Sequence, residues 1–249
     1  ISGKCGDNAE WSYNTGTKVL TISGSGAVDR AVDSDTSKQK IEGLAEPYEV
    51  KERITCSVKE IKIEEGITAL AVSNLFGNVS KDEDAEEIKL SLPDSLERIN
   101  ANTFAPTTDA AYIRTIHLPR NVRYIEGGAF WGLGATDTSD TFNENLTITV
   151  DSKNPYYMTE NNVLFTKDKK TLVYYPVEKT EQSYRIPKSV TKVEALAFSR
   201  NPFLKKVVLP TGITDIGAGA FYGDSKLSDI NLAQAVNVKK LSDFDGVKA

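Results

Sequence analysis

The stretch HLPRNVRYIEGGAF, residues 117–130, decides the fold because the chain writes its pattern three more times. The other copies are SLPDSLERINANTF at 91–104, RIPKSVTKVEALAF at 185–198 and VLPTGITDIGAGAF at 208–221. Each copy has an apolar residue before proline, apolar residues four and seven positions after it, and phenylalanine twelve positions after it. Neither a helix nor a single strand has this spacing. The pattern therefore indicates a chain that turns between the apolar positions and points each of them into one shared interior.

The repeat also has a constant period. The residue before proline recurs after 23 residues from Ile186 to Leu209 and after 26 residues from Leu92 to Leu118, and Leu232 stands a further 23 residues after Leu209. A period of 20 to 29 residues is the mark of a leucine-rich solenoid, in which each coil buries its interior only against its neighbours. In each coil the alternation before proline predicts a short strand, and proline, which has no N–H to donate, ends it. Seven parallel strands are predicted, centred on Ile61, Leu90, Ile116, Ile148, Tyr184, Val207 and Ile230.

The last apolar residue of each coil predicts a stacked interior row, which we call the spine. Its members are expected to be Leu75, Phe104, Phe130, Phe198 and Phe221.

The residues resemble the BspA-like leucine-rich repeat proteins of bacterial surfaces. The coil endings Ala129-Phe130, Ala197-Phe198 and Ala220-Phe221 match that family's repeat. KCGDNAEW at 4–11 with LTISGSG at 20–26 is similar to its N-terminal unit, and NPYYMTENNVLFTKDKKTLVYYP at 154–176 to a hairpin inserted between its coils. The resemblance implies an α/β repeat solenoid, wound right-handed, with parallel strands on the concave face and mostly β or irregular structure on the convex face. It also implies a secreted or cell-surface location and a role in adhesion.

Two domains are expected along the chain. Residues 1–57 form an N-terminal β cap: a hairpin around the NTGT turn at 14–17, then an irregular stretch at 29–50 with a short helix. Residues 58–249 form the solenoid, and the insert contributes strands VLFT (163–166) and TLVYY (171–175). The final coil, around residues 232–241, lacks the Ala-Phe ending and is either a natural cap or the result of truncation.

The composition argues against two classes of partner, nucleic acids and the membrane interior. The net charge is -5, which argues against nucleic acid, because that affinity rests on clustered Lys and Arg. No apolar run is long enough to cross a membrane as a helix, so no membrane insertion is expected within this chain. The first residue is Ile1, which is expected after removal of a signal peptide or after trimming.

The chemistry-bearing residues are few. The chain has one histidine, His117, and no Ser or Cys motif beside it, so we predict no catalytic site, no metal site and no cofactor. Cys5 and Cys56 are either two buried thiols or a disulfide, and the extracellular setting that the resemblance implies favours the disulfide. The acidic run at 82–87 is read as a solvated loop, with a calcium site as the alternative.

The best binding candidate is the set of side chains that alternate outward from the parallel strands, which we call the outward row. It consists of Lys62, Ser91, His117, Thr147, Thr149, Arg185, Val208 and Asn231. The row covers roughly 440 Å², less than the ~800 Å² that each partner buries in a standard protein interface. Flanking loops would have to contribute.

The predicted function is therefore non-catalytic recognition or adhesion at a bacterial surface, through a protein or glycan partner. One alternative is a carbohydrate-binding module that uses aromatic residues in or near the insert. These are Trp131, Tyr156, Tyr157, Tyr174 and Tyr175, which could equally fill the gap between insert and coils. The other alternative is a purely structural module that displays further domains.

Overall fold

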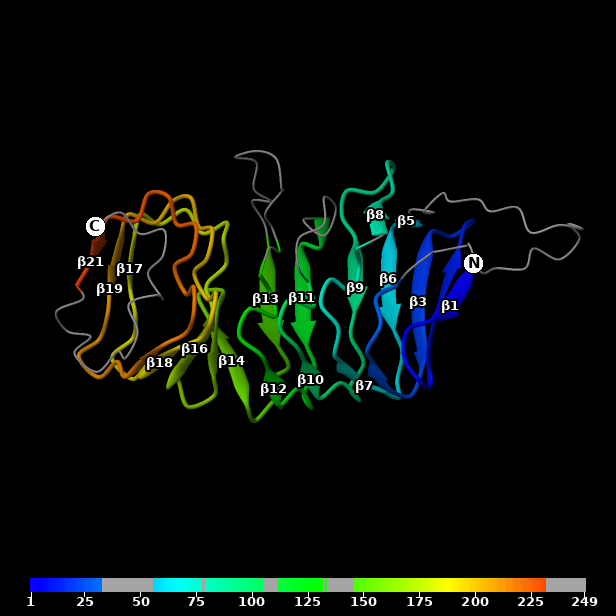
Figure 1. Ribbon diagram of the computed structural model, residues 1–249, viewed down its shortest axis with the longest axis horizontal. Helices are drawn as coiled ribbons and strands as arrows, with labels where there is room; N and C mark the ends of the chain where they lie inside the picture. The colour runs from blue at the N-terminus through cyan, green and yellow to red at the C-terminus, as the bar shows by residue number, and fades with distance from the viewer. Residues whose placement is uncertain (33–55, 78, 105–111, 132, 134–145, 232–249) are drawn as a thin grey trace, which may run out of the picture.

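The computed structural model describes residues 1–32, 56–77, 79–104, 112–131, 133 and 146–231. The chain winds into an elongated stack of coils, with β1 (Ser2–Lys4) and β21 (Asp229–Ile230) at opposite ends (Figure 1). These residues form strands and turns and contain no α-helix. The predicted α/β class is therefore not confirmed, because the described return segments of the coils are turns and short strands. The helix expected within 29–50 lies outside the described residues apart from 29–32, as does the coil at 232–241.

Each coil has a first strand whose inward residues are the repeated apolar anchors. In β11, for example, Ile116 and Leu118 are buried while Thr115 and His117 are exposed. All seven predicted strand positions lie in such strands, which confirms the repeat. The first strands are β6 (Glu60–Ile63), β9 (Lys89–Ser91), β11 (Thr115–Leu118), β13 (Thr147–Val150), β17 (Ser183–Arg185), β19 (Lys206–Val208) and β21.

These strands do not form the single sheet that was expected. Parallel ladders join β6 to β9, β11 to β13, and β17 through β19 to β21, so the row of strands is divided into three. The first division coincides with the longer 26-residue step between Leu92 and Leu118. The second coincides with the insert, which lies between β13 and β17 in the chain.

Proline starts the same turn in four coils. The carbonyls of Pro93, Pro119, Pro187 and Pro210 each accept a hydrogen bond, 3.0 to 3.3 Å long, from the N–H three residues later. The turn brings the next apolar anchor inward and leads into a second strand. The second strands are β4 (Gly26–Val28), β7 (Ile67–Leu70), β10 (Arg98–Ile99), β12 (Tyr124–Ile125), β16 (Thr171–Tyr174), β18 (Lys192–Val193) and β20 (Asp215–Ile216).

The spine is made of stacked rings inside the coils. Phe104 and Phe130 stack with ring centroids 5.8 Å apart, and Phe198 and Phe221 with centroids 5.0 Å apart. Leu75 is fully buried, but the ring that contacts Phe104 belongs to Phe76, at 6.1 Å. The spine position of that coil is thus one residue later than the spacing suggested. A left-handed residue stands two positions before each of the five rings: Asn74, Asn102, Gly128, Leu196 and Gly219.

The N-terminal hairpin covers the edge of the first described coil. β2 (Ala9–Asn14) and β3 (Val19–Gly24) pair antiparallel across the 14–17 turn, and Trp11 and Leu20 point into the core. β3 then pairs parallel with β6, so the cap continues the ladder of the solenoid. The added strand β1 pairs with the outer side of β2 and is a short edge strand of three residues, which is one way in which proteins limit pairing with other chains.

The insert supplies the antiparallel part of a five-stranded sheet inside the solenoid. β14 (Tyr157–Glu160), β15 (Val163–Thr166) and β16 pair antiparallel, and β16 continues in parallel with β18. The full order of the sheet is β14-β15-β16-β18-β20. β14 was not predicted. Its two-residue turn to β15 is Asn161-Asn162, with φ 51° and 63°, the conformation that asparagine tolerates best after glycine.

This sheet separates two hydrophobic cores. Leu164 and Val173 pack into the N-terminal core, whereas Val163, Phe165 and Leu172 pack into the C-terminal core. Neighbouring residues of β15 therefore serve opposite cores, as expected for a strand that is buried on both faces. In Figure 1, β14 and β16 lie at the lower edge between β12 and β18.

Candidate functional site

The outward row is solvent-accessible, but it is split. Lys62, Ser91, His117, Thr147 and Arg185 are exposed, and Thr149, Val208 and Asn231 are partly exposed. Five positions lie on β6, β9, β11 and β13, and the remaining three lie on or just after β17, β19 and β21. No ladder joins β9 to β11, but these two strands still lie side by side (Figure 1), whereas the insert separates β13 from β17 along the chain. The row consequently offers two short surfaces in place of one.

Three members of the row already make hydrogen bonds within the protein. The Nδ1 atom of His117 lies 2.9 Å from Oγ1 of Thr149, its ladder partner in β13. The amide of Asn231 accepts from the Leu209 N–H at 2.7 Å and donates to the Leu209 carbonyl at 3.2 Å. Asn231 therefore extends the backbone hydrogen bonding of its neighbouring coil.

The aromatic residues of the insert are mostly interior. Tyr157, Tyr174 and Tyr175 are buried, and Trp131 is partly exposed. Tyr156 alone of the five is open to solvent, at 46% exposure. A sugar-stacking surface made of all these rings is excluded, because three of them face the hydrophobic cores.

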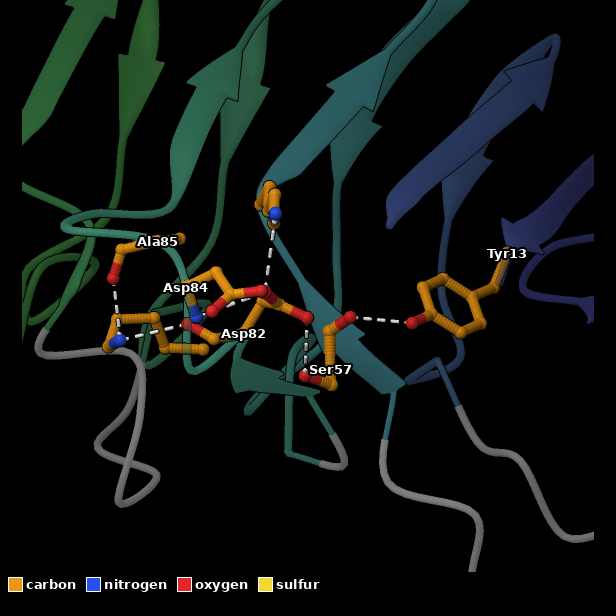
Figure 2. A network of polar contacts seen from close by, with 7 residues as sticks. Tyr13, Ser57, Asp82, Asp84 and Ala85 are labelled. Carbon is orange, nitrogen blue, oxygen red and sulfur yellow. Dashed lines mark hydrogen bonds and ion pairs between the residues drawn. The ribbon is translucent and has the colours of Figure 1, made fainter. Parts of the chain in front are cut away.

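The acidic run at 82–87 contains a cation from the protein itself. Nζ of Lys81 donates to the carbonyls of Asp82 at 2.8 Å and Ala85 at 2.6 Å. Figure 2 shows Ala85, one of the two acceptors, beside Asp82 and Asp84. Carbonyl oxygens that would be ligands for calcium are thus occupied by lysine. Among the described residues, no group of three or more His, Cys, Asp or Glu is placed to hold a metal ion.

Asp82 fixes this loop to the first coils. Its carboxylate accepts from Oγ of Ser57 at 3.2 Å and from the Asp84 N–H at 3.2 Å, and Nζ of Lys59 lies 3.5 Å away. Tyr13 of the cap donates to the Ser57 carbonyl at the other end of the network (Figure 2). Burial alone would raise the pKa of Asp82, but the Asp84 N–H, Lys59 and Ser57 together hold it below its usual value. The network is structural.

Cys5 and Cys56 are buried, free thiols in the structure. Burial, followed by the nearby carboxylate of Asp29, raises the pKa of Cys5 to about 11, and burial also raises the pKa of Cys56. Such thiols react slowly because the thiolate is the nucleophile. The disulfide between them stays a prediction, checked by counting alkylatable thiols in the unreduced, denatured protein.

The structure also shows a groove that the sequence did not reveal. It has a volume of about 430 Å³, is open to solvent, and lies between the turn after β11 and the turn before β14. Its lining residues are Glu97, Arg120, Asn121, Arg123, Lys153, Pro155 and Tyr156. The sequence contained only a weak signal for this groove. RNVR at 120–123 has two arginines and SKNPYY at 152–157 has one lysine, but nothing in the sequence indicates that the two stretches lie close together.

Comparison with models of protein families identifies the family to which the repeats belong. The model described as "BspA type Leucine rich repeat region" matches residues 86–153 and 174–247 in six copies. The chain belongs to this family. The unmatched stretch between the two segments, 154–173, corresponds to β14, β15 and the start of β16, so the insert interrupts a run of BspA-type repeats.

One solved structure supports a leucine-rich repeat fold, and two more distant ones were also found. A leucine-rich repeat protein from Eubacterium ventriosum is 23% identical with a TM-score of 0.52, over 100% of this chain and 71% of that chain. A leucine-rich cell surface protein from Faecalibacterium prausnitzii is 18% identical with a TM-score of 0.48, over 96% and 81% of the two chains. The pneumococcal vaccine antigen PcpA is 18% identical with a TM-score of 0.48, over 90% and 68%. No curated protein matches the chain. Within its described part, no helix has the length and apolarity needed to span a bilayer.

Proposed function

We propose that this chain is a non-catalytic recognition module of a bacterial surface protein. Membership of the BspA-type family supports a secreted or surface-attached location. The observation that carries the recognition role is the outward row, in which side chains stay exposed on strands whose alternate residues are buried. Such strands hold their outward side chains in fixed positions at little entropic cost on binding.

The size of the row limits the partner. Four strands about 4.8 Å apart and about 13 Å long cover roughly 250 Å², and the C-terminal group of three strands covers less. A protein partner, which needs about 800 Å² on each side, would have to contact the loops flanking the row as well. A glycan of a few sugars could be held by one group of strands alone.

Charge reversal on the row tests the proposal. Lys62→Glu, His117→Glu and Arg185→Glu change exposed positions of three first strands, and Arg98→Glu and Asp215→Lys change exposed positions of second strands as controls. Each variant is applied to arrays of glycans and of purified extracellular proteins. Recognition through the row predicts hits that the row variants lose and the controls keep.

A purely structural module is the second candidate, and it is favoured by the ladder roles of His117 and Asn231. Arrays without any hit, or hits that all five variants keep, would contradict the row and support the structural role.

A further inference from the structure

The groove beside β14 concentrates positive charge on an acidic protein. The chain carries a net charge of -5, yet the groove is lined by Arg120, Arg123 and Lys153 against the single carboxylate of Glu97. Its volume of about 430 Å³ is within the range of ligand sites, but the lining lacks the apolar majority that such sites usually have. The charge and polarity of the lining point to a hydrophilic, anionic ligand.

The walls of the groove are held rigidly by a buried asparagine. The Asn154 amide donates to the carbonyls of Pro119 at 2.9 Å and Val122 at 3.0 Å. Its oxygen accepts from the N–H groups of Tyr156 at 2.7 Å and Tyr157 at 2.9 Å. The turn that carries Lys153 and Tyr156 is thereby fixed onto the turn that carries Arg120 and Arg123. A site preorganised in this way loses little entropy when a ligand binds.

The cations retain hydrogen-bonding capacity. Arg123 binds Glu97 through Nε at 3.0 Å and Nη2 at 2.7 Å, and Arg120 binds Asp94 through Nη2 at 2.8 Å. A guanidinium has five N–H donors, so both arginines keep donors for a ligand. Nζ of Lys153 has no ion-pair partner among the described residues. The existing pairs are exposed and therefore weak, so a ligand anion can compete with them.

The remaining lining groups suit a sugar ring. Tyr156 is 46% exposed, whereas the next residue, Tyr157, is 6% exposed. An exposed aromatic ring beside polar groups is an amphipathic surface for a flat, partly apolar ligand face. The Asn121 amide donates to the Asp94 carbonyl at 2.7 Å, which leaves its own oxygen as an acceptor for a hydroxyl group.

We propose that this groove binds an acidic saccharide, with a sugar ring against Tyr156 and its carboxylate or sulfate group between Lys153 and Arg120. The site is separate from the outward row and does not depend on the function proposed for that row. Its position follows from the insert, because the turn before β14 supplies Lys153, Pro155 and Tyr156.

Titration with defined hexasaccharides tests the proposal. Hyaluronan carries carboxylates only, heparin carries sulfates as well, and chitohexaose is neutral. We expect at least one acidic hexasaccharide to bind, with an affinity that falls as NaCl is raised from about 0.05 M to about 0.5 M, and chitohexaose not to bind. Comparison of the two acidic ligands shows whether carboxylate alone suffices.

Matched variants tie the binding to the groove. Arg120→Ala, Lys153→Ala and Tyr156→Ala should each weaken binding about tenfold, or about 1.4 kcal/mol. Lys188→Ala, at the position equivalent to Arg120 in another coil, and Tyr222→Ala, an exposed tyrosine elsewhere, should change it less than about twofold. Lys62→Ala on the outward row should also leave saccharide binding unchanged. A negative result for the groove is therefore distinguishable from a negative result for the outward row.

Three results would overturn the proposal: no acidic hexasaccharide binds, chitohexaose binds equally well, or the groove variants and their controls behave alike. Inorganic polyphosphate serves as a further probe. If it binds more tightly than both acidic saccharides, and Tyr156→Ala leaves that binding intact, the groove is a plain anion site and the saccharide is wrong.

Discussion

Tyr174 and Tyr175 are consecutive residues whose rings belong to opposite hydrophobic cores. The ring of Tyr174 lies 5.5 Å from that of Phe130, and the ring of Tyr175 lies 4.9 Å from that of Phe198. The two tyrosines therefore connect the halves of the spine across the insert. The N–H of Tyr175 also donates to the Ala197 carbonyl at 2.8 Å, as the N–H of Phe198 donates to the Ala220 carbonyl. Tyr175 thus occupies the spine position of its own coil.

Removal of one ring from the spine should be costly. Phe198 is fully buried between the rings of Tyr175 and Phe221. Phe198→Ala should lower the free energy of unfolding by about 3–5 kcal/mol, because the neighbouring rings cannot close the cavity. Urea denaturation measures the change. Wild-type stability in this variant would count against a packed spine. Tyr222→Ala, which removes an exposed ring, is the control.

Loss of the hydroxyl group should change the free energy of unfolding differently at two buried tyrosines of the insert. Oη of Tyr157 accepts a hydrogen bond of 2.9 Å from the N–H of Ile125, the free edge of β12. Oη of Tyr175 has no hydrogen-bond partner in the described part of the chain. Tyr157→Phe should cost about 1–3 kcal/mol because a buried N–H loses its acceptor, whereas Tyr175→Phe should be neutral or stabilising.

Urea denaturation of the two variants measures the change in the free energy of unfolding when the same hydroxyl group is removed from a hydrogen-bonded tyrosine and from one without a partner. Equal losses in the two variants would contradict the hydrogen bonding described for the insert.

Stability should fall as pH rises above about 4, because two buried carboxyl groups prefer the neutral form. Burial raises the pKa of Glu178 to about 7 and that of Asp224 to about 9. Between their ordinary values near 4 and these values, the folded protein holds protons that the unfolded chain releases, so unfolding becomes easier with rising pH. The part due to Glu178 is complete above about pH 7, and the part due to Asp224 above about pH 9.

Asp224→Asn isolates the contribution of Asp224. Asp224 stands 23 residues after Asn201, which lies one coil earlier in the chain. The Asn201 side-chain amide donates a hydrogen bond to the Val177 carbonyl at 3.0 Å. Oδ2 of Asp224, in contrast, has no hydrogen-bond partner among the described residues. Asparagine should stabilise the protein by about 1–3 kcal/mol at pH 8 and have little effect at pH 4. Urea midpoints at both pH values measure this, with the exposed Asp215→Asn as control. An unchanged pH dependence would refute the assignment.

The coils could be predicted from sequence because their signal is local. Ile116, Leu118, Val122 and Phe130 repeat at fixed offsets, and each offset corresponds to one turn or one strand of the coil. The error at Leu75 arose from counting that spacing through a coil in which the ring, Phe76, comes one residue later. The α/β class that the resemblance implied is not confirmed, because the described coils consist of turns and strands of two to four residues.

The insert and the groove were harder to predict because they depend on distant pairing. The runs VLF at 163–165 and LVYYPV at 172–177 are continuously apolar, which is typical of strands buried on both faces. Interpreted as a hairpin inserted between coils, they gave the correct strands but not the separation of two cores. The groove needs Arg120 and Lys153 on facing turns, and this placement rests on the Asn154 hydrogen bonds, which no local pattern encodes.

Thiol labelling across β16 tests the separation of two cores most directly. Cysteine is placed singly at Leu172, Val173, Tyr174 and Tyr175, with Lys170→Cys at an exposed position as the control. We measure the rate of maleimide labelling of the native protein above that of the parent chain. A strand buried on both faces predicts that all four consecutive positions stay protected while position 170 reacts at once. Alternating protected and reactive positions would show a hairpin with one face in water, and would contradict the two-core account.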